Sequence, residues 1–82
     1  MIKDKDIARE FLNKQFEVSE LMNQNLAELK DKLSAEEFDI TRKATAYMMA
    51  EILFRAIEPI LKEHPDLSPP ELADIYNPQP AE

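Results

Sequence analysis

The stretch ATAYMMAEILFRAIEPIL, residues 44–61, decides the fold of this chain of 82 residues. Its helical period leaves one narrow polar stripe, about 60° wide on a helical wheel. That stripe consists of Glu51, Arg55 and Glu58, and it continues to Lys62. Glu51 and Glu58 each precede a basic residue, Arg55 and Lys62, by four positions, which is the order that stabilises a helix. All other directions are apolar, so this helix needs cover on most of its circumference. A membrane span is the less favoured interpretation, because a charge at the centre of a span costs about 2.5–3.5 kcal/mol and Pro59 interrupts the helix.

Two stretches mark where helices begin. LSAEEF, residues 33–38, and LSPPEL, residues 67–72, each place a serine three residues before a glutamate. This spacing is typical of a capping box, in which the serine is the N-cap. Ser34 therefore predicts a helix over 35–63, and Ser68 predicts a short helix over 69–76, followed by an extended or disordered tail over 77–82. Pro59 predicts a kink, or a helix end near Ile57 with a resumed turn.

The N-terminal third predicts another helix, over 5–32, beginning near Asp4 or Asp6. Apolar residues recur along it at helical intervals and are expected to form its inner face: Ile7, Phe11, Val18, Met22, Leu26, Leu29 and Leu33. Continued in the same phase, Phe38 would fall on the polar side, which favours a corner at Ser34 over one uninterrupted helix. Glycine is absent, so tight hairpin turns are disfavoured and an all-α fold is expected.

These elements predict a single domain over residues 1–76, built as a long antiparallel helical hairpin with a short C-terminal helix. One antiparallel neighbour leaves much of the segment 44–61 uncovered, and a chain this small is marginally stable alone. We therefore expect two copies to pair as a homodimeric four-helix-type bundle. The expected interface residues are Met48, Met49, Ile52, Leu53, Ala56 and Ile60. The alternative is a monomeric three-helix bundle in which the helix over 69–76 acts as a lid.

The sequence offers no catalytic signature. Cysteine is absent and His64 is the one histidine. A histidine in the last turn of a helix is usually explained by the negative helix end. Leu61 stands three residues before it, where a di-metal bundle site needs glutamate. We therefore expect no enzyme activity, no metal and no cofactor.

Charge and composition narrow the partner classes. The formal net charge of −7 disfavours nucleic acid and anionic membranes, which both attract Lys and Arg. The charged N-terminus, MIKDKDIARE, lacks the apolar run of a secretory signal, so the cytoplasm is expected. The favoured function is a homodimeric protein-interaction module, in which the Pro-rich end, from Pro65 onward, is a presented segment or a clasp across the partner chain. The alternative is an acidic inhibitor, such as an immunity protein or a nucleic-acid mimic, that binds a basic protein. Its acidic face would be Glu10, Glu17, Glu20, Glu28 and Asp31.

Overall fold

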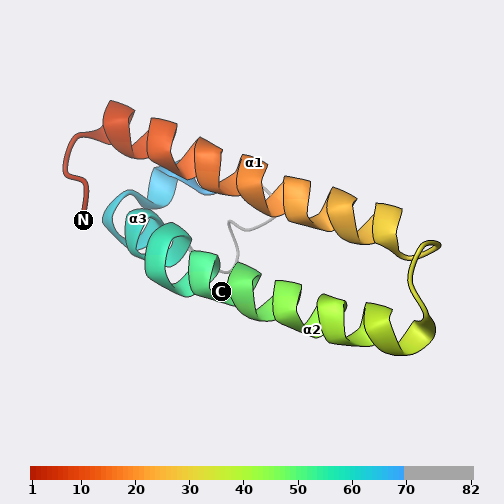
Figure 1. Ribbon diagram of the computed structural model, residues 1–82. Helices are drawn as coiled ribbons and strands as arrows, with labels where there is room; N and C mark the ends of the chain where they lie inside the picture. Colours follow the sequence, from red (N-terminus) through yellow and green to blue (C-terminus); the bar gives the residue numbers. More distant parts are fainter. Residues whose placement is uncertain (70–82) are drawn as a thin grey trace, which may run out of the picture.

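The computed structural model describes residues 1–69, and every regular element in this range is helical. Helix α1 (Lys5–Leu29) and helix α2 (Ala35–Ile52) run side by side in opposite directions, as Figure 1 shows. The α2 helix continues through a π-helical turn, η1 (Leu53–Ile57), into α3 (Glu58–Glu63). A 3₁₀ turn, η2 (Pro65–Leu67), follows. The expected all-α class is thus confirmed for the described residues. The short helix expected over 69–76 and the tail over 77–82 lie outside them, apart from residue 69.

Side-chain caps fix where the two long helices begin. The Asp4 side chain accepts a hydrogen bond from the Ile7 N–H at 3.0 Å. At the second corner, the Ser34 hydroxyl accepts from the Glu37 N–H at 3.1 Å. The Glu37 carboxylate in turn accepts from the Ser34 N–H at 3.1 Å. This is the capping box predicted from LSAEEF, and it satisfies backbone donors that the helix itself cannot pair.

Pro59 is accommodated without ending the helix. The N–H of Glu58 donates to the carbonyl of Leu53, five residues back, which gives the wider π-helical turn. Pro59 then occupies the first turn of α3, so its missing N–H falls where the π-helical turn gives way to the α-helix. The π turn also changes the phase of the helix, so that Ile57, Ile60 and Leu61 all become buried.

The buried core lies at one end of the hairpin, where α3 meets the first half of α1. It consists of Ala8 and Leu12 from α1 with Ile57, Ile60 and Leu61. The predicted inner face of α1 was only partly right: five of its seven residues are half-buried, and it omitted the buried Ala8 and Leu12. Ile7 is 55% exposed and Val18 is 41% exposed. Small Ala8 lets the helices approach closely, and Leu12 fills the contact beside it.

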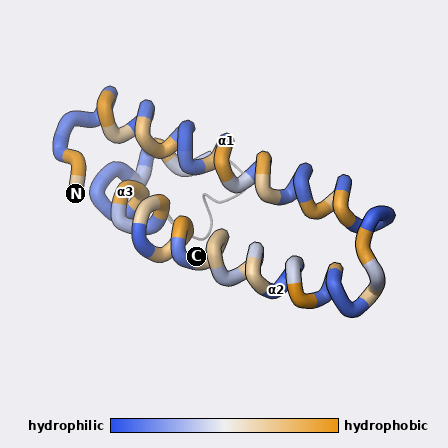
Figure 2. The backbone as a smooth tube through the Cα atoms, viewed as in Figure 1, coloured by the Kyte–Doolittle hydropathy of each residue, from blue (hydrophilic) through white to orange (hydrophobic). Residues whose placement is uncertain are grey.

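The two ends of the hairpin differ in how they are held. At the core end, the Met1 ammonium pairs with Glu63 Oε1 at 2.8 Å, and Lys5 pairs with Asp66. Along α2, which forms the other end, Thr45 is the one buried residue. Figure 2 shows apolar residues along the whole length of both helices, well beyond the buried core. The far half of the hairpin therefore leaves apolar surface uncovered by residues 1–69.

Candidate functional site

A shallow apolar groove runs along one side of the hairpin. Its volume is about 470 Å³. Its lining comes from both helices and the π turn: Phe16, Ser19, Ala46, Met49, Ala50, Leu53 and Ile57. Ala46 and Ala50 are four residues apart, so they lie one above the other on the same flank of α2. Their small side chains leave the hollow between Phe16 and Leu53. We refer to these seven residues as the groove.

The opposite side of the hairpin carries a second apolar surface. Thr45 is buried against α1 and Leu12 lies in the core. At about 100° per residue, Ala46 and Met48 lie on opposite flanks of Thr45. Phe16 and Val18 likewise lie on opposite flanks of Leu12. Because the groove joins the flanks of Phe16 and Ala46, the flanks of Val18 and Met48 share the other side.

We refer to this second surface as the open face. Its members follow one another at intervals of four and seven residues on α1 and of four residues on α2. They are Ile7, Phe11, Val18, Met22, Ala44, Met48 and Ile52. Val18 is 41% and Met48 50% exposed, whereas Phe11, Met22 and Ile52 are half-buried. An exposed apolar row of this kind usually marks a contact surface.

The six residues expected at a dimer interface do not share one surface. Met48 and Ile52 belong to the open face, whereas Met49 and Leu53 line the groove. Ala56 is half-buried at the π turn. Ile60 is 0% exposed within the single chain, so it has no surface to offer to a partner. The π turn explains this last difference, because it rotates Ile60 into the core.

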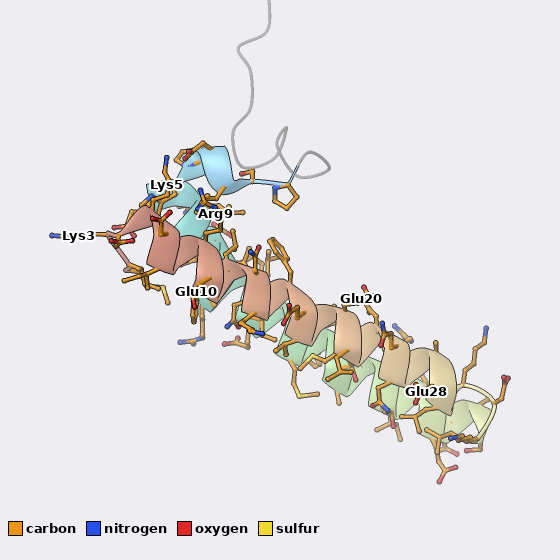
Figure 3. All side chains as sticks on the ribbon, turned by 90° about the horizontal axis from the view of Figure 1, so that it is seen from above. Lys3, Lys5, Arg9, Glu10, Glu20 and Glu28 are labelled. Atoms are coloured by element: carbon orange, nitrogen blue, oxygen red, sulfur yellow. The ribbon has the colours of Figure 1, made fainter. Side chains whose placement is uncertain are left out.

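The five residues of the expected acidic face are all exposed. Figure 3 shows the labelled Glu10, Glu20 and Glu28 following α1 along its length. Two of the five have local partners: Lys14 Nζ lies 3.0 Å from Glu17 Oε2, and the Gln24 amide donates to Glu20 at 3.5 Å. The row is therefore a solvated strip of negative charge on the outside of the hairpin, and most of its members have no ion-pair partner within residues 1–69.

His64 has a structural partner. Its Nε2 lies 2.8 Å from the backbone carbonyl oxygen of Ile2. A carbonyl can only accept, so Nε2 carries the proton and donates it. Within residues 1–69, no three His, Asp or Glu side chains gather closely enough to hold a metal ion. This contact gives the single histidine a role in holding the N-terminal residues against the end of α3.

Four carboxyl groups in the described range have clearly lowered pKa values, and each has a local cause. Hydrogen bonds from Ser34 lower the pKa of Glu37, and hydrogen bonds from Arg42 and Lys43 lower that of Asp39. The Met1 ammonium lowers the pKa of Glu63, and Lys5 lowers that of Asp66. These contacts favour the ionised carboxylate in a cap or an ion pair, so these four groups serve the fold.

No family model, curated protein or solved structure matches the chain. Among the helices of residues 1–69, none is both long enough and apolar enough to cross a bilayer. The candidate site is therefore defined by surface alone: the open face, the groove and the acidic row.

The groove was not predicted from the sequence. In the sequence alone, Phe16 is one of several aromatics at core spacing, and Ser19 is a polar residue at the edge of the apolar face of α1. The available signal was the pair Ala46 and Ala50 at helical spacing, beside larger apolar residues. Such a pattern indicates either close helix approach or a hollow, and the position of α1 decides which.

Proposed function

We propose that this chain is a small homodimeric helical module of the cytoplasm, without catalytic activity, that serves to bind another protein. Two hairpins pair through the open face and form a four-helix bundle. In such a pair each open face covers the other, because a two-fold axis brings the same patch of both subunits together.

The observation that carries this proposal is a partly exposed apolar stripe on α1. Ile7, Phe11, Val18 and Met22 form the strip whose spacing of four and seven residues is typical of helices that pack in bundles. Ile7 and Val18 stay exposed in the single chain, because Ala8 and Leu12 are the residues of α1 that enter the buried core. A second copy supplies the missing cover.

Size supports the same conclusion. Only five apolar residues of the described range form the buried core, and all of them lie at one end. A domain near this length gains little stability from its own core and commonly adds a partner. Burying Val18 and Met48 on both subunits would extend the core along the hairpin.

The test is the molar mass of the full chain in solution. One chain has a mass of 9.5 kDa, and sedimentation equilibrium is expected to give twice this value at micromolar concentration. A mass of one chain across the whole concentration range would overturn the homodimer. Capture of a protein partner by the wild-type chain, lost on substitution of the dimer surface, tests the binding role.

The acidic row supports a second candidate, a charge-steered inhibitor of a basic protein. The five acids stay exposed on α1, and the net charge of −7 adds long-range attraction for a positive partner. Binding of this kind weakens steeply as salt rises, because screening acts on exposed charges. If the affinity for a captured partner does not change with ionic strength, this second function is excluded.

A further inference from the structure

The groove lies where the described chain ends. Leu67, at the end of η2, packs against the core cluster that contains Ile57. Ile57 also lines the groove. Leu67 and Ile57 thus belong to one packed cluster, and this cluster reaches the groove.

The end of the described chain also lies on the correct side of the hairpin. The pairing of Lys5 with Asp66 holds η2 against the first turn of α1. Figure 3 shows this segment in blue alongside α1, beside the labelled Lys5 and Arg9. Arg9 and Phe16 are seven residues apart, two helical turns, so they lie on the same flank of α1. The chain therefore leaves Leu67 on the flank that forms the groove.

We propose that residues 70–82 of the same chain fill the groove. From Ile57 to Ala46 the groove follows eleven residues of helix, about 17 Å at 1.5 Å per residue. Five or six extended residues span about this length. The segment is long enough to cover the groove in either an extended or a helical form.

The chemistry of the segment fits the groove. Leu72, Ile75 and Tyr76 recur at intervals of three and four residues, so a helix would present them on one side. Six of the seven residues that line the groove have apolar side chains, and Ser19 is the exception. The segment begins within reach at high effective concentration, which favours it over a separate molecule.

This arrangement gives the two sides of the hairpin different occupants. The chain's own C-terminal segment covers the groove, and a second copy covers the open face. The two contacts lie on opposite sides, so either can form without the other. The groove contact does not depend on the proposed homodimer.

The experiment uses the full chain labelled at the methyl groups of methionine and isoleucine. Nuclear Overhauser effects (NOEs) are expected between the methyl groups of Met49, in the groove, and Ile75. Met48 is the internal control, because it lies on the other side of α2 and should show no such contact with Ile75. Absence of the Met49–Ile75 effect would overturn the proposal.

A pair of variants gives a second readout. Ala46→Glu places a charge in the groove on α2. Ala27→Glu places a charge outside the groove, at an exposed position of α1. Ala46→Glu is expected to abolish the Met49–Ile75 effect and to speed chymotrypsin cleavage after Tyr76 several-fold. Ala27→Glu should change neither. Equal cleavage rates in wild type and Ala46→Glu, with helix content retained in both, would contradict the proposal.

A mixture of chains labelled only at methionine methyl groups and chains labelled only at isoleucine methyl groups identifies the source of the segment. Contacts within one chain give no Met49–Ile75 effect in this mixture, although the doubly labelled chain shows the effect. A Met49–Ile75 effect in the mixture would show that a second copy supplies the segment, and would overturn the intramolecular assignment. The molar mass of the chain, measured separately, decides the homodimer whichever result is obtained.

Discussion

The imidazole Nε2 of His64 donates a hydrogen bond to the backbone carbonyl of Ile2, 2.8 Å away and 62 residues earlier in the sequence. This contact joins the two ends of the described chain at the core end of the hairpin. It lies beside the ion pairs of Met1 with Glu63 and of Lys5 with Asp66. The three contacts together hold the N-terminal residues over the buried cluster.

Replacing His64 should destabilise the fold through this hydrogen bond. His64→Ala removes a buried donor and leaves the Ile2 carbonyl without its partner, at an expected cost of about 1–3 kcal/mol in the free energy of unfolding. His64→Gln retains a side-chain N–H donor and should lose less. Urea denaturation at one fixed protein concentration measures both. Equal losses in the two variants would show that ring packing, and not the hydrogen bond, stabilises this end.

The ion pairs at the same end predict an acid-sensitive contribution to stability. The Met1 ammonium holds the pKa of Glu63 below its ordinary value of 4.5. A carboxyl group with a lowered pKa in the folded state stabilises the fold above the unfolded value. That contribution is lost as the pH falls from about 4.5 through the folded pKa.

Glu63→Gln should therefore reduce the melting temperature at pH 7 and flatten its decline below pH 4.5. Glu10→Gln is the matched control, because Glu10 makes no ion pair among the described residues. Thermal melts followed by circular dichroism between pH 3 and 7, a window taken to bracket ordinary carboxyl values, give the comparison. Parallel pH profiles for wild type and Glu63→Gln would count against a stabilising role for this pair.

The contribution of the capping box between α1 and α2 to the free energy of unfolding should be measurable separately from that of side-chain packing. Ser34→Ala removes the acceptor for the Glu37 N–H and is expected to cost about 1 kcal/mol of unfolding free energy. Ser34→Asp keeps a side-chain acceptor at the N-cap and should restore most of this stability. If alanine and aspartate behave alike, the cap contributes nothing measurable.

The core end should respond to truncation much more strongly than the outer surface. Leu12 is almost fully buried, so Leu12→Ala should cost about 2–5 kcal/mol through lost burial and the cavity left behind. Ile40 is exposed, and Ile40→Ala should change stability by no more than about 0.5 kcal/mol. Urea denaturation of both variants at the same concentration tests the position of the core. A small effect at Leu12 would contradict it.

Local sequence signals predicted the helices well. Ser34 and Glu37 fixed the second helix start through groups only three residues apart, and the absence of glycine indicated the fold class. These features depend on groups that are close together in the sequence, so they can be recognised without knowing how the helices pack.

The packing of the helices could not be predicted in the same way. Ile7 and Val18 were expected on the inner face of α1, but both are exposed, and Ala8 and Leu12 are the buried residues of this helix. A small residue permits the closest approach, and the π turn before Pro59 moves Ile60 into the core. Both effects depend on the partner helix, so hydrophobic spacing along one helix does not reveal them. For the same reason the expected interface set was divided between two sides of α2.

The most direct test of the central claim compares two charge substitutions on neighbouring residues of α2. Met48 is 50% exposed on the open face, and Tyr47 is 76% exposed and lies on the side of α2 away from the buried Thr45. Sedimentation equilibrium of the full chain measures the molar mass of each variant at the same concentration. Our account predicts a single-chain mass of 9.5 kDa for Met48→Glu and twice that mass for Tyr47→Glu, as for wild type. A dimeric Met48→Glu, or dissociation of Tyr47→Glu alone, would contradict pairing through the open face.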